Sequence, residues 1–178
     1  EVEKFDLRWT CHSRDAEFIK LFKDDIGYTG KISTFKRPPH DKDTTHTSIK
    51  LLGLRQMATD IKANFGYGAN KTYHLPPPNL EKLELKLAFL AGYINGDGWV
   101  SLGKNNLAIG LVSASENIIK WVKEVIESLN LPCASKRLGQ IYKYGDKCFR
   151  FILGGTRAIY LYWLLKRVPV PILERKWN

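Results

Sequence analysis

A nine-residue segment near the middle of the chain limits its possible folds more than any other feature. The segment, LAGYINGDG at residues 90–98, closes a stretch in which apolar residues recur at helical spacing. Ala91, Gly92 and Gly96 leave one part of this helix with little side-chain bulk, so the backbone of a second helix can approach closely. The pattern predicts a helix that packs against another helix through Ala91, Gly92 and Gly96.

An acid and a glycine end the same helix. We expect Gly98 to stop the helix in a backbone conformation with positive φ, which leaves Asp97 at the carboxyl end. The helix dipole does not favour an anion at that end, so a bound cation explains a carboxylate there better. If a partner helix brings a second acid beside Asp97, the two carboxylates can hold a divalent metal against a phosphate.

Residues 90–98 resemble the LAGLIDADG motif of homing endonucleases at every position except Tyr93, Asn95 and Gly96. The resemblance implies that Asp97 binds a catalytic Mg²⁺, with the Gly96 carbonyl as an extra ligand; Mn²⁺ or Ca²⁺ can occupy the same site. Asn95 is the main departure, because the family usually has an acid there. The structural alternative is a helix of small residues that ends in a Gly-Asp-Gly turn.

The two parts of the chain have the same predicted order of elements. In the first part we expect a strand over residues 4–12 and a helix over 13–25 with Ser13 as its N-cap. Strands over 31–37 and 47–52, joined by a polar turn over 38–45, and a helix over 54–65 follow. In the second part we expect helices over residues 80–96, 116–129 and 156–166, and strands over residues 99–104, 107–113, 135–142 and 148–153. We interpret the similarity as an internal repeat.

The resemblance implies a mixed α/β (α+β) fold of two αββαββα half-domains with saddle-shaped antiparallel sheets. The run Pro76-Pro77-Pro78-Asn79 is a stiff connector, so we expect an N-terminal half-domain over 1–75, a linker over 76–79 and a C-terminal LAGLIDADG half-domain over 80–178. The first half lacks a counterpart of the opening helix and strand. We expect either a monomer with a first motif ahead of these residues, or a dimer of two chains through Leu87 to Gly98.

The composition favours a polyanionic partner in a reducing compartment. The net charge is +10 and the pI is near 9.5, values shared by nucleases, ribosomal proteins, repressors and membrane-surface binders. Three cysteines without a CxxC pair argue against a disulfide framework and a zinc knuckle. No apolar run suits a membrane span or signal peptide. We expect an intracellular protein, in a microbe, a phage-infected cell or an organelle, with double-stranded DNA and no membrane as its partner.

Alternation along the strands predicts which side chains face DNA. The resemblance implies one sheet per half along the major groove, with Val100 and Leu102 packed beneath the helices. The residues expected to face DNA are Ser101, Gly103, Asn105, Ser135, Arg137 and Arg150 in the second half and Arg37, Ser48 and Lys50 in the first. The alternative for each is an ordinary solvent-facing strand residue.

Two lysines are catalytic candidates by the same resemblance. Lys176 follows the last predicted helix, and Lys71 has the matching place in the first half. A lysine there can polarise the attacking water or neutralise charge that develops on the phosphate. The alternative for both is a solvated lysine.

Three classes of function fit these features. The first is an intron-encoded homing endonuclease, a hydrolase that makes Mg²⁺-dependent double-strand breaks in a long DNA target, which is asymmetric because the halves differ. The second is a cleavage-inactive nucleic-acid-binding protein, either an intron RNA maturase or a DNA-binding regulator, which Asn95 and the missing first motif favour. A basic structural protein is the third. Metal-dependent cutting that is lost in Asp97→Asn would distinguish the first from the others.

Overall fold

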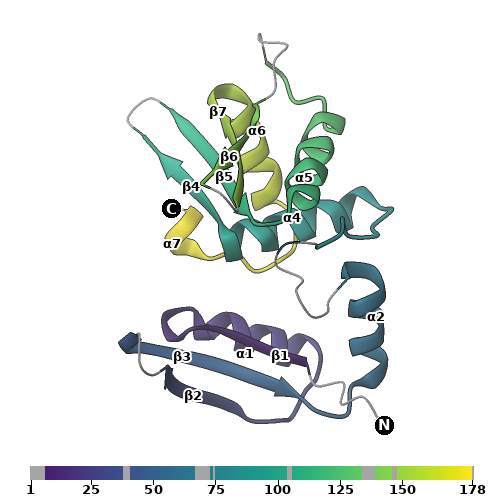
Figure 1. Cartoon of the computed structure of the whole chain (residues 1–178), viewed down its shortest axis with the longest axis vertical. Helices are drawn as coiled ribbons and strands as arrows, with labels where there is room; N and C mark the ends of the chain where they lie inside the picture. Colours follow the sequence, from purple (N-terminus) through teal and green to yellow (C-terminus); the bar gives the residue numbers. More distant parts are fainter. Residues whose placement is uncertain are drawn as a thin grey trace. The chain divides into compact units, whose positions relative to one another are not determined.

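The chain divides into two compact units, Glu1–Lys62 and Ala63–Asn178. The computed structural model describes residues 7–37, 41–66, 73, 75–103, 106–133, 139–145 and 148–177 (Figure 1). This boundary falls before the proline-rich run, and Asn64 and Phe65 belong to the second unit. The Asn79 amide donates to the Asn64 carbonyl (2.9 Å), and the rings of Phe65 and Phe89 stack with centroids 5.7 Å apart.

The first unit is a three-stranded antiparallel sheet with a helix on one face. Its elements are β1 (Leu7–His12), the 3-10 helix η1 (Ser13–Asp15), α1 (Ala16–Asp25), β2 (Ile32–Arg37), β3 (Asp41–Leu51) and α2 (Arg55–Phe65), with strand order β1-β3-β2. Ile19 of α1 is buried with Ile49 and Leu51 of β3, and Trp9 of β1 packs against this cluster. Alternation therefore leaves the opposite face of the sheet to the polar strand residues.

Two expectations for the first unit are wrong. Ser13 is not the N-cap of α1: it begins η1, and its hydroxyl accepts a hydrogen bond from Thr47 (3.1 Å). The polar turn expected over 38–45 ends earlier, because β3 already begins at Asp41 and pairs with β2 around a bulge between Lys36 and Arg37. Strand residues on a face without a helix can be polar, so polarity did not indicate a turn here.

The second unit has the expected order of helix, two strands, helix, two strands and helix. The elements are α4 (Leu83–Asp97), β4 (Gly98–Leu102), β5 (Leu107–Ser113), α5 (Glu116–Ser128), β6 (Ile141–Tyr144), β7 (Cys148–Gly154), α6 (Gly155–Lys166) and α7 (Glu174–Trp177), with strand order β4-β5-β7-β6. The sequence did not predict α7. The pairing β5-β7-β6 repeats β1-β3-β2 of the first unit, which agrees with an internal repeat.

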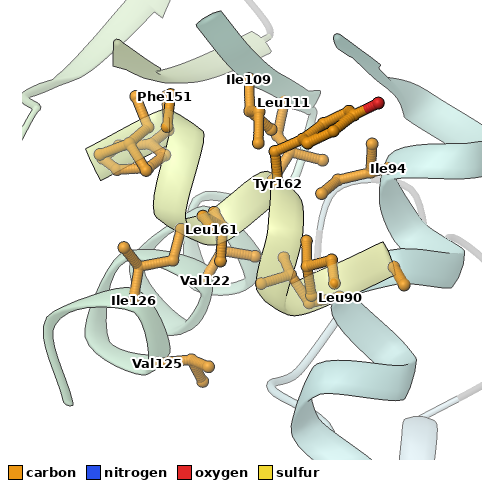
Figure 2. Packing of buried hydrophobic residues seen from close by; sticks show 14 of the residues in the cluster. Leu90, Ile94, Ile109, Leu111, Val122, Val125, Ile126, Phe151, Leu161 and Tyr162 are labelled. Atoms are coloured by element: carbon orange, nitrogen blue, oxygen red, sulfur yellow. The ribbon is translucent and has the colours of Figure 1, made fainter. Parts of the chain in front are cut away.

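The core of the second unit lies on one face of this sheet. Figure 2 shows Leu161 of α6 among side chains of the neighbouring helices, and Ile109, Leu111 and Phe151 come from the sheet. Complete burial of a leucine, isoleucine or phenylalanine stabilises a fold by roughly 1.5–3 kcal/mol. The buried strand residues share one side of the sheet, so the other side, here called the open face, carries no helix of the core.

Two expectations from composition concern disulfides and membrane spans. Cys11, Cys133 and Cys148 are free, in agreement with the expected lack of a disulfide framework. Within the described residues, no helix combines the length and the apolar character that a bilayer crossing requires.

Candidate functional site

Asp97 is the last residue of α4, and its side chain is exposed. The next residue, Gly98, was expected to have a positive φ, but it is extended, with φ −96° and ψ 179°. A glycine is required at this position for another reason. A β-carbon on residue 98 would lie 2.7 Å from the Ile94 α-carbon and 3.0 Å from the Gly110 carbonyl oxygen. Close packing of helix end and strand therefore places Asp97 at the edge of the sheet.

Lys176 of α7 caps the carboxyl end of α4. Its ammonium donates to the carbonyls of Ile94 (3.2 Å), Gly96 (2.9 Å) and Gly98 (2.8 Å). The carbonyls at a helix end lack partners within the helix and carry partial negative charge, which a cation satisfies. An ammonium has three N–H donors, and these three bonds direct Lys176 at the backbone of the helix end. The Gly96 carbonyl already faces this cation, which disfavours the metal ligand role expected for it.

Asn95 is a buried clamp between α4 and the last residues of the chain. Its Oδ1 accepts from the Leu173 amide (3.1 Å) and from Nε1–H of Trp177 (2.8 Å), and its Nδ2 donates to the Pro171 carbonyl (3.0 Å). An ionised carboxylate accepts hydrogen bonds but cannot donate to Pro171. These hydrogen bonds therefore explain why the motif has an amide at residue 95 in this chain and not a carboxylate.

We call residues 171–177 the C-terminal latch. Trp177 is fully buried, and its carbonyl accepts a hydrogen bond of 2.5 Å from the Tyr162 hydroxyl. Lys166 donates to the same hydroxyl at 3.2 Å. The latch thus contacts both α4 and α6, and it fixes the helical turn that ends at Asp97.

Removal of the lysine cap gives a first prediction. We expect Lys176→Met to lower the free energy of unfolding by about 1–3 kcal/mol, because three carbonyls lose a charged donor. Urea unfolding measures this change. The matched control is Lys120→Met, which removes an exposed ion pair with Glu116 (3.0 Å) and costs under about 1 kcal/mol. Equal losses in the two variants would contradict the capping role.

Tyr93 of α4 is electrostatically linked to Asp97. Burial raises the pKa of Tyr93, and the negative charge of Asp97 raises it further, while a hydrogen bond with Ser113 lowers it. Because the raised pKa lies above its ordinary value near 10, the phenol stays neutral at physiological pH. Tyr93 therefore adds no negative charge beside that of the Asp97 carboxylate.

Asp97 has the chemistry of a partial magnesium site. The described residues hold no group of three or more histidine, cysteine, aspartate or glutamate side chains that could bind a metal on their own. Mg²⁺ is commonly bound through one or two carboxylates, with waters and substrate phosphates as its other ligands. The exposed Asp97 carboxylate fits such a donor set, which a second acid and a phosphate would complete.

The exposed side of α4 presents the two glycines but not the alanine. Gly92 and Gly96 are exposed, and a β-carbon at either position would meet no atom within 4 Å. Ala91 is fully buried in the core of its own unit, so its expected role in contact with a second helix is wrong. The helical period of 3.6 residues places residues 92 and 96 on one side and turns residue 91 away from it.

On the open face of the second unit, Ser101 is exposed and Arg150 is half-buried. Gly103 lies in the turn after β4, where its amide donates to the Asn106 carbonyl (2.8 Å). Leu102 was expected beneath the helices, but 57% of it is exposed, because it ends β4 beyond the packed core. Trp99 lies on this face as well, and the sequence had not placed it.

On the corresponding face of the first unit, Lys50 is exposed but Ser48 is buried. Arg8 donates to the Ser48 hydroxyl (3.4 Å) and also lies over the Phe35 ring, 5.1 Å from its centroid. The Phe35 ring in turn stacks on His46 at 5.8 Å. The expectation that Ser48 is available to DNA is therefore wrong, and Arg8 and Phe35 are face residues that strand alternation across the pair would have indicated.

The remaining candidates are not placed in space. Lys71, Asn105, Ser135 and Arg137 lie outside the described residues, and Arg37 is described by its backbone alone. Sequence reasoning also missed the clamp role of Asn95, although a signal existed. Helical spacing places Asn95 one turn after the buried Ala91, and a polar side chain on an apolar side requires partners.

Comparisons with known proteins agree with this geometry. The LAGLIDADG-like domain family matches residues 84–142. The structure is similar to the N-terminal LAGLIDADG domain of DUF199/WhiA, with a TM-score of 0.54 and 9% identity, over 97% of this chain and 75% of that one. It is also similar to the LAGLIDADG meganuclease I-AabMI bound to uncleaved DNA, with a TM-score of 0.52 and 14% identity, over 97% and 76%. No curated protein matches the sequence.

These likenesses define the fold. Residues 84–142 match the LAGLIDADG-like domain family, and the chain has the fold of solved LAGLIDADG structures, which include the meganuclease I-AabMI. At these identities the solved structures show the fold alone, so activity has to be argued from the site.

Proposed function

We propose that this chain is a DNA-binding homing endonuclease that makes metal-dependent double-strand breaks in a long, asymmetric target. The observation that carries the proposal is the exposed Asp97 carboxylate, which the lysine cap and the latch hold at the end of α4, where β4 begins. A net charge of +10 supports a polyanionic substrate. The similarity to a meganuclease bound to DNA agrees with duplex DNA as the partner.

The residues of the chain have separate tasks in this proposal. Bound Mg²⁺ would supply activation of water and stabilisation of the leaving oxygen. Asp97 would hold the metal, and Asn95 and Lys176 keep its backbone turn in place through their bonds to Pro171 and Gly96. Tyr93, neutral at physiological pH, adds no charge to the environment of Asp97.

The second carboxylate comes from a second helix in this proposal. Gly92 and Gly96 leave open space along α4, so the backbone of another helix can pack closely there. That helix belongs either to the same protein, which then acts as a monomer, or to a second copy of the chain. In both cases it brings an acid beside Asp97.

A cleavage-inactive nucleic-acid-binding protein is the second candidate. The observations that favour it are the bonds of Asn95 and Lys176, which stabilise the backbone at this helix end; within the described part of α4, Asp97 is the one acid in its last turn. In this case the sheets bind DNA or intron RNA and the helix end has no chemical task.

Selection from a randomised duplex DNA library distinguishes the candidates. We expect the protein to enrich one long asymmetric sequence, and to cut it on both strands with Mg²⁺ but not with EDTA, because the chelator removes the ion that Asp97 binds. Mobility shift measures binding, and denaturing gels measure strand cutting. Enrichment without cutting under any divalent ion would favour the second candidate, and failure to enrich any duplex would contradict DNA binding.

A further inference from the structure

Trp99 of β4 lies across the open face of the four-stranded sheet. It is paired with Gly110 of β5, and its ring covers the place where a β-carbon of residue 110 would lie. Any side chain at residue 110 would displace the ring, so Gly110 allows the indole to rest on the strand. The indole is therefore held against backbone as a rigid platform.

Arg150 of β7 lies over this platform. The carbon at the centre of its guanidinium lies 5.0 Å from the centroid of the Trp99 ring. The two residues belong to strands that are not neighbours, because β5 separates β4 from β7 in the sheet. The missing side chain at Gly110 leaves room for this contact across β5.

We propose that Trp99 and Arg150 form a preorganised pair that recognises a guanine base in the major groove of duplex DNA. The inference rests on the proposed function and adds a specificity-determining element to it. A guanidinium that stacks through its flat face can donate hydrogen bonds in its own plane at the same time. Guanine presents two acceptors, O6 and N7, at the spacing that arginine matches with two parallel bonds.

The surroundings of Arg150 favour a base edge over a phosphate. Its neighbours in the register are Val112 of β5 and Tyr142 of β6, and Ile152 follows on the same side of β7. These side chains carry no charge, and β7 lies inside the sheet between β5 and β6. Base edges are recognised by hydrogen bonds and apolar contacts, and these uncharged neighbours can supply apolar contacts beside the Arg150 guanidinium.

Selection with variants tests the pair. The probe is a randomised duplex DNA library bound in Ca²⁺, followed by affinity measurements on the enriched duplex and on duplexes changed at one base pair. We expect Arg150→Lys, which keeps the charge, to lose the preference for one guanine and to bind the enriched duplex roughly tenfold to a hundredfold more weakly. Trp99→Leu should lose the same preference. Arg167→Lys, a control after the end of α6, should keep it.

The outcomes separate this inference from the proposed function. If the native chain enriches no duplex, the proposed function fails and this inference fails with it. If the native chain selects a sequence but Arg150→Lys keeps every base preference, this inference alone is wrong. A uniform loss of affinity on all duplexes, with a weaker salt dependence, would assign Arg150 to a phosphate and would also overturn it.

Discussion

Asp97→Asn is expected to lower the rate of DNA cleavage at least about a hundredfold, since loss of a metal ligand costs more than loss of an outer partner. The amide keeps the shape of the side chain but removes the negative charge that holds a divalent ion. Binding should persist, because the open faces of the sheets do not depend on this carboxylate. Single-turnover cleavage of the enriched duplex at saturating protein measures the rate, and mobility shift in Ca²⁺ measures the affinity.

A matched control for this variant exists in the first unit. Asp25 also ends a helix, α1, and is also exposed, so Asp25→Asn makes the same chemical change at a similar position. We expect it to cleave at the native rate. If Asp97→Asn cleaves as fast as the native chain, the essential carboxylate lies elsewhere and the proposed site is wrong.

Asn95→Asp is expected to lower the free energy of unfolding by about 2–4 kcal/mol at neutral pH, and not to raise cleavage. The variant restores the acid that the LAGLIDADG motif usually carries, so a rise in activity is the intuitive alternative. In this structure, however, the side chain is 4% exposed and donates to the Pro171 carbonyl. An ionised carboxylate there loses the donor and buries a charge, which loosens the latch that supports Asp97.

The loss of unfolding free energy caused by Asn95→Asp should be smaller at low pH than at high pH. Burial disfavours the charged form, so the pKa of the introduced carboxyl is higher in the folded than in the unfolded chain. A group of this kind contributes stability below its unfolded pKa and loses it as pH rises through the folded pKa. Relative to the native chain, the variant should therefore be less destabilised at about pH 5 than at about pH 8.

Urea unfolding of the variant and the native chain at both pH values measures this difference. Asn117→Asp is the control, because Asn117 is exposed in the first turn of α5, where a negative charge is tolerated. It should show little change at either pH. If Asn95→Asp keeps native stability and cleaves faster, residue 95 faces the metal and the clamp described above is wrong.

The order of the elements and the place of Asp97 at a helix end could be predicted from the sequence alone. The αββαββα order of the second unit follows from the change between helical and alternating hydrophobic spacing, which is a local property. The end of α4 at Asp97 was predicted from the glycine that follows it, although the structure requires that glycine for close packing against Ile94 and Gly110 and not for a positive φ. The polar turn over 38–45 was wrong because a strand beside an uncovered face has no hydrophobic pattern to reveal it.

The contacts of the side chains around Asp97 could not be predicted from the sequence, because they join residues that are far apart along the chain. Lys176 contacts carbonyls 78 to 82 positions away, and Asn95 contacts the latch at separations of 76 to 82. Trp99 reaches Arg150 across an intervening strand. Residue type and spacing cannot distinguish a lysine that caps a helix from one that acts on a phosphate, because both need only a flexible cation. The difference lies in which oxygens the folded chain brings within hydrogen-bond distance of it.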